Sequence, residues 1–513
     1  MAISTDGPLR LWQARCVEAL AAIPDVTIVR WVRAPEDRPS SDPGVESGAL
    51  SIAPMPRALA AVRPEDEPAG RRSDAPPGSV DVLLDLTERR HPTPVPWAPE
   101  VWRFGYGRAL TRNASLVALR DYVRGPGVTR VALVSEPSGS ILHDGWLQTV
   151  SWWKGAPLEA LLLEPASWPA AAALDRTNPS PVAGARPADQ TVADRRSLTP
   201  PRLMLLVAAA ARRAIGATDS LMGRDNWNVG VLPGPIEQVL TSMQRPEIRW
   251  LPTVPGHYAA DPFGLERDGT LHVFFEDFDH RTGVGSICHV SIATDGTVSE
   301  PESVLNPGVH ASYPFLVEHE GQVFMLPETS AAGELILYRA DDFPRAWRPA
   351  ATLLEGIPVL DASVIEYDGR WWMFATRQDR GGNQNLFVWH APALFGPWAP
   401  HAANPVKTDA RSARPGGTPF FFNGQLYRPS QDDSLVYGGR VVVNRVDVLT
   451  TRSFAERPVT AIEPQRGSPY QNGLHTLSSA GANTLVDGNS RRLTLGTLRQ
   501  NVARRLPGRR ARQ

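Results

Sequence analysis

Carboxylates flank a short strand pair in the second half of the chain. In the segment DPFGLERDGTLHVFFED, residues 261–277, Asp261 precedes the first expected strand and Glu276 follows the second. The Asp-Gly dipeptide between the strands is typical of a two-residue β-hairpin turn. Because a hairpin begins and ends at the same edge, the two carboxyl groups are expected to be neighbours. Paired carboxyl groups can divide acid and base roles, which is the chemistry of glycosyl cleavage or transfer.

The same hairpin pattern occurs four more times. The further segments are YPFLVEHEGQVFMLPE, DASVIEYDGRWWMFAT, GGTPFFFNGQLYRPSQ and GLHTLSSAGANTLVDG. The five turn glycines lie 48 to 57 residues apart and are Gly269, Gly321, Gly369, Gly424 and Gly481. A period near ~50 residues with four strands per unit predicts a five-bladed β-propeller. The last unit lacks outer strands, so WNVGVL (227–232) and IRWLPTV (248–254) are expected to complete it and close the ring, which removes exposed edges.

Superposition of the turn glycines defines two columns of residues on one rim of this propeller. The first column, which precedes the first strand of each hairpin, holds Asp261, Tyr313, Asp361, Gly416 and Gly473. The second column, which follows the second strand, holds Glu276, Glu328, Thr376, Gln431 and Gly488. Innermost strands begin around a central depression, so the acids of both columns are expected to converge on a funnel. The predicted catalytic residues are therefore Asp261, Glu328, Asp361 and Glu276. Each acid could alternatively bond turn amides or pair with arginine.

Other polar residues around this rim are predicted to bind the substrate. They are His257, His310, Arg377, Arg414, Gln431, Asp432 and His475. Arg414 precedes Pro-Gly-Gly, where glycine permits close approach to the backbone, and its guanidinium suits a carboxylate or phosphate. Alternatively, Arg414 pairs with Asp432 or Asp433. Histidines at these positions could bind a metal, but repeated polar residues often serve turn bonding, so neither a metal site nor a cofactor is predicted.

Residues 225–490 resemble the five-bladed propeller region at the N-terminus of plant glucosamine inositolphosphorylceramide transferases. The resemblance rests on DPFG at 261, EGQVFMLPETS at 320, DASVIEYDGRWWMFATR at 361, RPGG at 414, QLYRPSQD at 425 and GLHTL at 473. The repeat is more distantly similar to five-bladed glycoside hydrolases that act on arabinans, xylans and fructans. That resemblance implies that Asp261 is the general base and Asp361 the modulating acid. Glu328 is the chosen proton donor, one blade earlier than in the hydrolases.

Residues 1–166 are expected to form an α/β domain. The segment 9–33 combines an amphipathic helix with a β-branched strand, and VDVLLDL, VWRFGYG, TRVALVS and WLQTVSWW are strand-like around a helical pattern at 109–123. LWQARCVEAL, DVLLDLTER and PEVWRFGYG resemble a formyltransferase-type domain. That family implies an Asn, a His and an Asp around a folate site, and no Asn-x-His or HPSLLP-like segment occurs, so the domain is interpreted as degenerate.

Pro-rich composition marks the remaining boundaries. An irregular excursion is predicted at 35–79 and a linker at 167–202, followed by a connecting helix at 203–224 and the propeller at 225–490. The tail at 491–513 has eight arginines and no acid. It could contact anionic lipid at a membrane surface or be a disordered, solubilising segment.

Composition narrows the classes of function. The balance of 53 basic and 54 acidic residues gives no global electrostatic reason to expect a nucleic-acid partner. Two cysteines suit a reducing compartment and exclude a disulfide scaffold. The longest apolar run is well short of the ~20 residues that span a bilayer. A cytoplasmic location is therefore expected, with peripheral contact at the inner membrane surface as a further possibility.

The sequence thus predicts a multidomain protein with an N-terminal α/β domain and a C-terminal all-β five-bladed propeller. The leading hypothesis is an enzyme of surface glycan or glycolipid metabolism that transfers or cleaves a glycosyl unit in the funnel, using its carboxylates. The first alternative is a non-catalytic glycan-binding scaffold. A second alternative is formyl or acyl transfer to an amino sugar by the N-terminal domain.

Overall fold

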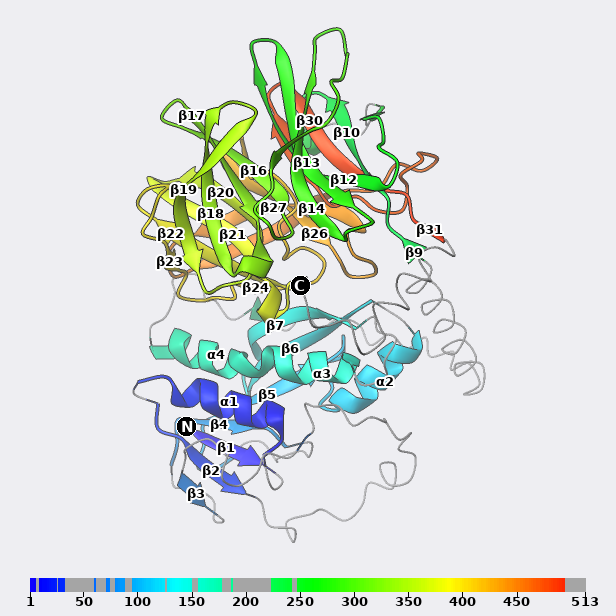
Figure 1. Cartoon of the computed structure of the whole chain (residues 1–513). Helices are drawn as coiled ribbons and strands as arrows, with labels where there is room; N and C mark the ends of the chain where they lie inside the picture. Colours follow the sequence, from blue (N-terminus) through cyan, green and yellow to red (C-terminus); the bar gives the residue numbers. More distant parts are fainter. Residues whose placement is uncertain are drawn as a thin grey trace. The chain divides into compact units, whose positions relative to one another are not determined.

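The structure is a computed structural model in which two compact units, Met1–Ala214 and Ile215–Gln513, are each described by themselves (Figure 1). It describes residues 1–5, 9–24, 26–32, 60, 71–73, 79–87, 95–124, 127–149, 156–177, 186–187, 223–241 and 247–493. Most of the predicted excursion and connecting helix, and the tail beyond residue 493, lie outside these ranges. None of the helices in the described ranges is long and apolar enough to span a membrane.

The N-terminal unit is built on one eight-stranded sheet in the order β3-β2-β1-β4-β5-β6-β7-β8. The strands are β1 Ala2–Thr5, β2 Val29–Val32, β3 Arg71–Ser73, β4 Val82–Asp85, β5 Glu100–Tyr106, β6 Val128–Glu136, β7 Ser140–Gln148 and β8 Arg186–Pro187. The first five strands in chain order pair in parallel, and β5 to β8 pair antiparallel. This mixed sheet confirms the α/β class. The strand β1 was not predicted from the sequence, because four residues are too few to show a period.

Helices supply the other half of the N-terminal core. They are α1 Leu11–Ala21, α2 Ala114–Arg124, α3 Ala156–Leu163 and α4 Trp168–Thr177, with the 3-10 turn η4 Glu164–Ser167 before α4. The prediction of a linker from residue 167 is wrong at its start, because α4 packs Trp168 and Ala172 into the core that also holds Trp12 of α1. An alanine-rich run favours a helix, and Pro169 is tolerated in the first turn. The strand β8 also lies within the predicted linker, where it pairs with β7.

The C-terminal unit contains five four-stranded sheets, the predicted propeller blades. Blade 1 is β12 His257–Arg267, β13 Thr270–Asp279, β14 Val284–Ile292 and β15 Glu302–Leu305. Blade 2 is β16 Ser312–His319, β17 Gln322–Glu328, β18 Glu334–Asp342 and β19 Ala346–Glu355. Blade 3 is β20 Val359–Tyr367, β21 Arg370–Arg377, β22 Asn385–Ala391 and β23 Ala399–Pro400, with β24 Lys407–Thr408 beside β22. Blade 4 is β25 Phe420–Phe422, β26 Gln425–Asp432, β27 Arg440–Leu449 and β28 Phe454–Ile462.

Blade 5 closes the ring with strands from both ends of the unit. It combines β29 Leu477–Ala480 and β30 Asn483–Asn489 with β10 Trp227–Pro233 and β11 Arg249–Trp250. The expected completion of the last blade by the segments at 227–232 and 248–254 is therefore confirmed. A short helix, α6 Gln238–Thr241, lies between β10 and β11, and β9 Gly223–Arg224 pairs with β31 Arg492–Leu493.

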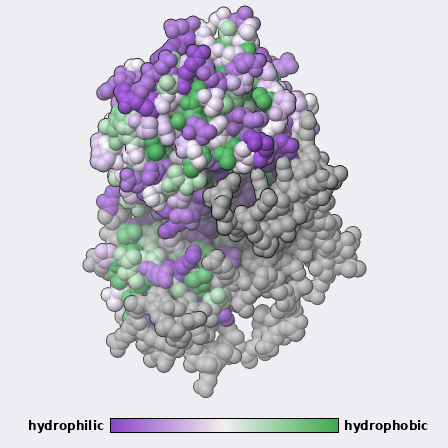
Figure 2. All heavy atoms as spheres, in the orientation of Figure 1, coloured by the Kyte–Doolittle hydropathy of each residue, from purple (hydrophilic) through white to green (hydrophobic). Residues whose placement is uncertain are grey.

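The sequence of the turns explains the regularity of the blades. In blades 1 to 4 the two turn residues both have positive φ, for example 52° at Asp268 and 74° at Gly269. Such backbone is open to Gly and, among other residues, mainly to Asn and Asp, which the Asp-Gly and Asn-Gly dipeptides supply. Hydrophobic side chains then fill every space between blades, such as Phe274 against Met325 between blades 1 and 2. On the outside, hydrophobic residues are scattered among hydrophilic ones on the face shown in Figure 2.

Candidate functional site

Three innermost strands share the same irregularity at the rim. The pairing register breaks between Ala260 and Phe263 in blade 1, and at the corresponding places in blades 2 and 3. The residues inside these breaks have φ of 52°, 46° and 50° and are Asp261, Tyr313 and Asp361. Left-handed backbone is unusual for residues other than glycine, and such strain clusters at functional sites. These are the residues that the glycine superposition placed in the first column.

Asp261 lies in a buried cluster with residues of blade 5. Its Oδ1 accepts a hydrogen bond of 3.0 Å from Thr476 Oγ1 and is 3.3 Å from His475 Nε2. The other imidazole nitrogen, His475 Nδ1, is 2.5 Å from Asp487 Oδ2. Asp487 also accepts hydrogen bonds from the backbone N–H groups of Asp261, His475 and Thr476. The imidazole therefore bridges two carboxyl groups.

Burial and charge set the protonation of this cluster. Burial alone lowers the pKa of His475, but the carboxylates of Asp487 and Asp261 outweigh it and raise that pKa to about 9. Burial, helped by the charges of Asp361 and Asp487, raises the pKa of Asp261 to about 6, although His475 opposes the rise. At neutral pH the arrangement is therefore an imidazolium beside an ionised Asp261.

Asp361 lies in a second buried cluster with residues of blade 4. Arg414 Nε donates to Asp361 Oδ2 at 2.6 Å, and Gln431 Nε2 donates to the same oxygen at 2.5 Å. Arg414 also donates to Asn383 Oδ1 at 2.9 Å, and its guanidinium lies 5.2 Å from the centre of the Tyr437 ring. The alternative prediction that Arg414 pairs with Asp432 or Asp433 is not what the structure shows, because its partner is Asp361.

The two glutamates of the second column are held differently from the aspartates. Burial first, and then the charge of Asp261, raise the pKa of Glu276 well above its usual value. For Glu328, burial and then the charge of Asp361 raise the pKa in the same way. Glu328 accepts hydrogen bonds from Ser330 Oγ at 3.1 Å and from the Asp361 backbone N–H at 3.3 Å. The mutual charge effects among these four acids show that they share one electrostatic site.

Three buried polar atoms of the second column have no hydrogen-bond partner among the residues that the structure describes. They are Glu276 Oε1, Thr376 Oγ1 and Gln431 Oε1. Buried polar groups are nearly always bonded, and exceptions call for an explanation such as water or a ligand. His310 Nε2 lies 3.5 Å from Glu276 Oε1, beyond a good hydrogen bond, while His310 Nδ1 accepts from the Gly285 backbone N–H. A ligand with several hydroxyl groups could satisfy these three atoms.

Tyr313 crosses between blades beneath these clusters. Its buried hydroxyl oxygen lies 2.8 Å from Ser363 Oγ of blade 3 and accepts a 2.7 Å hydrogen bond from the Gly417 backbone N–H before blade 4. Gly417 has φ of 131°, and a side chain there would begin 1.7 Å from the Leu477 carbonyl oxygen. Tyr313 was placed in the first column by the sequence but was not predicted to have this bridging role.

Asp487 and Thr476 were not among the predicted site residues. The superposition placed Gly488 in the second column, because it aligned Gly481 with the other turn glycines. In blade 5, however, Ala480 pairs with Asn483, so Gly481 is the first residue of the two-residue turn, whereas Gly269 is the second. A shift of one residue along a strand moves the expected position to the opposite face. The corrected second-column position is Asn489, and Asp487 lies two residues before it on the same face of β30.

The predicted binding residues divide into two groups. Arg414, Gln431 and His475 join the two aspartate clusters, and His310 faces Glu276. The others pair locally: His257 with Asp277 at 2.9 Å, Arg377 with Asp379 at 2.8 Å, and Asp432 with Arg440 at 2.8 Å.

The cluster of Asp261, His475 and Asp487 also has spacing that could suit a metal, with its ligand atoms all within 4.8 Å of one another. A metal ligand must be a neutral imidazole. Burial lowers the pKa of His475, but the carboxylates of Asp487 and Asp261 outweigh it and raise that pKa to about 9, which favours the imidazolium in the metal-free protein.

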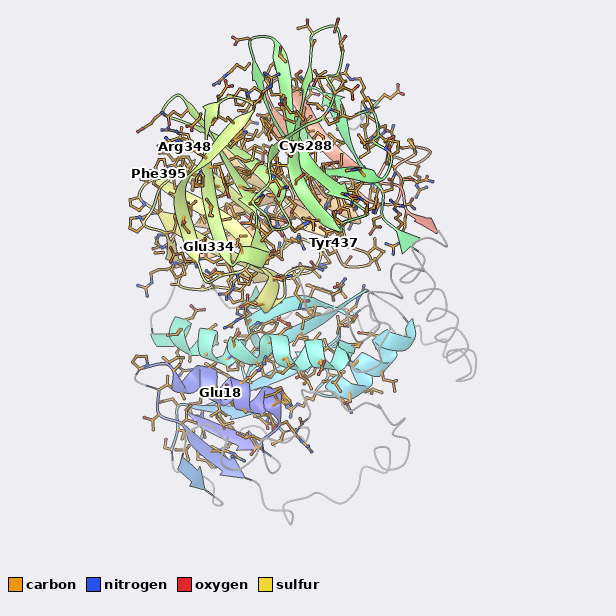
Figure 3. The ribbon with its side chains drawn as sticks, in the orientation of Figure 1. Glu18, Cys288, Glu334, Arg348, Phe395 and Tyr437 are labelled. Carbon is orange, nitrogen blue, oxygen red and sulfur yellow. The ribbon has the colours of Figure 1, made fainter. Side chains whose placement is uncertain are left out.

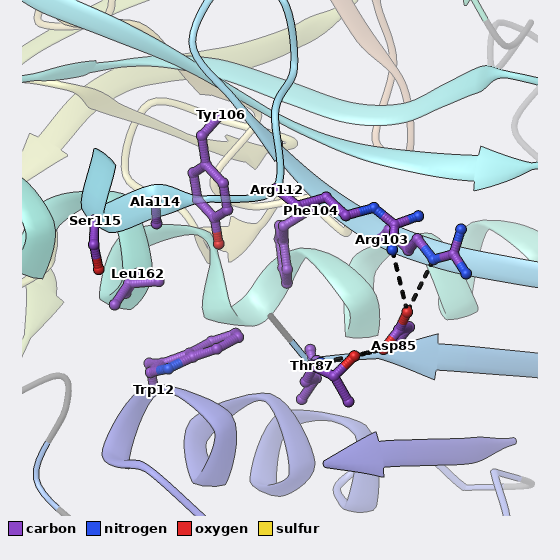
Figure 4. A pocket seen from close by; sticks show the side chains of 11 residues that line it. Trp12, Asp85, Thr87, Arg103, Phe104, Tyr106, Arg112, Ala114, Ser115 and Leu162 are labelled. Carbon is purple, nitrogen blue, oxygen red and sulfur yellow. Dashed lines mark hydrogen bonds and ion pairs between the residues drawn. The ribbon is translucent and has the colours of Figure 1, made fainter. Parts of the chain in front are cut away.

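A separate pocket lies in the N-terminal unit, where β4 and β5 end (Figure 4). Aromatic side chains of Trp12, Phe104 and Tyr106 line it together with a charged group. Arg103 and Arg112 pair with Asp85 and Glu136, so the charges compensate one another. The described lining residues include an aspartate but neither Asn nor His.

Comparison with known proteins concerns mainly the propeller. Residues 240–480 match the family described as Glucosamine inositolphosphorylceramide transferase 1, N-terminal. The propeller thus resembles the N-terminal part of these transferases. The chain is 35% identical to Glucosamine inositolphosphorylceramide transferase 1 of Oryza sativa subsp. japonica over 283 residues, 52% of this chain and 37% of that protein. It is 32% identical to the Arabidopsis thaliana protein of the same name over 264 residues, 48% of this chain and 34% of that protein.

The chain therefore spans little more than a third of the length of these relatives. The family match gives no support to the formyltransferase resemblance of residues 1–166. Among solved structures, an exo-beta-1,3-galactanase from Clostridium thermocellum has a TM-score of 0.36 and 12% identity, covering 41% of this chain and 53% of that chain. A family 117 glycoside hydrolase from Zobellia galactanivorans has a TM-score of 0.34 and 12% identity, and the match covers 54% of this chain and 92% of that chain. Similarities of this size establish no activity.

Proposed function

We propose that the funnel of the propeller acts on a carbohydrate, as an enzyme that transfers or cleaves a glycosyl unit of a glycan or glycolipid. The observation that carries this proposal is the set of four buried acids, which influence one another through their charges, together with the unbonded polar atoms Glu276 Oε1, Thr376 Oγ1 and Gln431 Oε1. The named relatives, inositolphosphorylceramide transferases, support a glycolipid as the substrate class.

The pKa shifts suggest a role for each acid. Asp261 has a pKa that burial raises to about 6, so it is ionised at neutral pH and can accept a proton from water or from an acceptor hydroxyl. Burial raises the pKa of Glu328 well above its usual value, which favours the protonated form that a proton donor to the leaving oxygen requires. Asp361 is held by Arg414 and Gln431, which suits a residue that positions substrate or tunes Glu328. Glu276 is the competing proton donor, because burial also raises its pKa and its Oε1 is unbonded.

A glycan-binding scaffold without turnover is the second candidate. It is favoured by the ion pairs that Asp361 and Asp261 already make with Arg414 and His475, since paired acids can orient a sugar without chemistry. In this case the unbonded atoms of the second column would bind hydroxyl groups and nothing would be cleaved.

A turnover screen separates the two candidates. The purified chain is incubated with pooled nucleotide sugars, oligosaccharides and extracted glycolipids, and products are detected by mass spectrometry. Asp261→Asn, Glu328→Gln and Glu276→Gln are run beside Glu355→Gln, an exposed glutamate at the end of the outer strand β19. Product that is lost in Asp261→Asn and in one of the two glutamate variants, but kept in Glu355→Gln, supports the enzyme. If the wild type and all variants bind a glycan and none forms product, the glycan-binding scaffold is the remaining candidate.

A further inference from the structure

An exposed apolar segment lies beside the buried cluster of Asp261 and His475. In the connection between β26 and β27, three consecutive side chains are 61%, 50% and 45% exposed: Leu435, Val436 and Tyr437. We call this segment, residues 435–437, the apolar lip. Single exposed apolar residues are ordinary, whereas a contiguous exposed group indicates an interaction surface.

The corresponding connections in other blades are polar. The connection between the second and third strands reads His-Arg-Thr-Gly at 280–283 in blade 1, Thr-Ser-Ala-Ala-Gly at 329–333 in blade 2 and Gln-Asp-Arg-Gly-Gly-Asn-Gln at 378–384 in blade 3. The repeat itself therefore does not require apolar residues at this place. The lip is a feature of blade 4 alone among these four connections.

Hydrogen bonds and packing fix the apolar lip next to His475. The Gly438 backbone N–H donates to Asp433 Oδ1 at 2.7 Å, and the Asp433 backbone N–H donates to the Ala410 carbonyl oxygen at 2.9 Å. Gly438 has φ of 60°, and a side chain there would meet Trp227 and His475 at less than 3 Å. The Tyr437 ring lies edge-on to the His475 ring, with 5.4 Å between their centres. A ligand that contacts His475 and Asp261 would therefore lie beside the lip.

We propose that the apolar lip inserts into the surface of a lipid bilayer, so that the funnel receives the sugar head group of a lipid-linked substrate. This inference rests on the proposed function, because only a lipid-linked substrate has hydrocarbon next to its sugar. Leu435 and Val436 would contact acyl chains, and Tyr437 suits the boundary between hydrocarbon and water.

The charges of the same rim predict the character of this binding. On this rim Arg281 pairs with Asp279, Arg377 with Asp379 and Arg440 with Asp432, and the exposed Arg380 directly follows Asp379 in the sequence. Attraction to anionic lipid is therefore weak on this rim, and binding should depend on apolar contact. Such binding persists at high salt, whereas binding by charge is screened.

Flotation of the full chain with phosphatidylcholine vesicles tests the proposal without any substrate. The wild type is expected to float with the vesicles equally in 0.1 M and ~1 M salt. In the double variant Leu435→Ser/Val436→Ser, loss of two apolar side chains should lower the bound-to-free ratio about tenfold or more. Phe395→Ser is the matched control, because Phe395 is 47% exposed and packs beside Phe324 near the hairpin turn of blade 2. Figure 3 labels Phe395 and Tyr437 at separate places on the propeller.

Each result has a clear meaning. Flotation of the wild type and of Phe395→Ser, with loss in the double variant, supports the lip as the membrane contact. A wild type that does not float, or a double variant that floats as well as the wild type, overturns it. Flotation lost at high salt also overturns it, since charge would then carry the binding. None of these readouts requires turnover, so failure of the proposed enzymatic function would appear separately, as absence of product in the turnover screen.

Discussion

The replacement Asp487→Asn should lower the pKa of the imidazole that lies beside Asp261, so that His475 loses its proton at a lower pH than in the wild type. In the wild type, burial lowers the pKa of His475, but the charges of Asp487 and Asp261 outweigh burial and raise this pKa from 6.5 to about 9. At 1.36 kcal/mol per pKa unit, this rise corresponds to about 3 kcal/mol of preferential stabilisation of the imidazolium. Asparagine keeps the shape of Asp487 and an oxygen that can accept from the backbone N–H groups of His475 and Thr476, but it removes one of the two charges.

The sign of the effect on stability follows from linkage. His475 is protonated more readily when folded than when unfolded, so the stabilisation is fully present below pH ~6.5 and is lost as the pH rises toward 9. Asp487→Asn should bring the pKa of His475 down by about one unit or more and move this loss to lower pH. If Asp261 is the base, kcat/KM should rise as the pH passes about 6, where burial places the pKa of Asp261, and should fall toward about 9 as His475 loses its proton. In Asp487→Asn the upper limb should move down.

NMR titration of the full chain labelled at histidine ¹³Cε1 measures the pKa directly. The chain has 11 histidines, and His475→Asn assigns the signal of interest. Asp277→Asn is the control, because it removes the partner of His257 and leaves the His475 cluster intact. The reasoning is refuted if His475 titrates at or below 6.5 in the wild type, or if Asp487→Asn leaves its titration unchanged.

Three further replacements test the packing that holds the site, each measured by the urea-induced unfolding of the propeller, with Glu355→Gln as the surface control. Glu456→Gln should destabilise by about 3–5 kcal/mol, because it leaves the fully buried Arg428 and the nearby Lys407 without their carboxylate; an unchanged midpoint would contradict this. Tyr313→Phe should destabilise by about 1–3 kcal/mol, since the buried Gly417 N–H loses its acceptor; a neutral result would show that another group takes over the bond. Gly417→Ala should lower the free energy of unfolding more than Gly424→Ala does. A Cβ atom at Gly417 would overlap the Leu477 carbonyl group, whereas a Cβ atom at Gly424 would have no atom of a described, non-adjacent residue within 4 Å. Equal losses of stability would refute the steric argument.

The fold of the propeller was predictable because its signals are local and repeated. A dipeptide such as Asp268-Gly269 specifies a tight turn, and four such turns, with the turn at Gly481 as the fifth, recur at a common period and specify the blades. The start of the N-terminal unit was harder to predict from the sequence. The strand β1 has only four residues, and its partners in the sheet lie 27 and 81 residues further along the chain. The helix α4 was missed for a different reason: a run of alanines reads as linker by composition, and only its burial distinguishes it from one.

The positions of the four acids on the rim were predictable from the sequence, but the residues that pair with them were not. The offset from the turn placed Asp261, Glu276, Glu328 and Asp361 on one rim, and the structure couples all four electrostatically. It could not show which cation each acid meets, because those contacts join blades: Asp361 to Arg414, and Asp261 to His475 over 214 positions of sequence. Asp487 was missed because a one-residue difference in the turn of blade 5 assigned the opposite face of β30 to the site, and because Asp487 lies two residues before the corrected position, Asn489.

This division also explains why ring closure matters for chemistry. Blades 1 to 3 supply the four predicted acids, whereas blades 4 and 5 and the segments just before them supply Arg414, Gln431, His475 and Asp487. His475 reaches Asp261 only because blade 5 is adjacent to blade 1, and the strand β10, from the other end of the unit, completes blade 5 by pairing with β30. Trp227 at the start of β10 stacks on His475 with 4.1 Å between ring centres. Closure therefore fixes the imidazole beside Asp261, so the ionised state of Asp261 is a property of the whole ring and not of blade 1 alone.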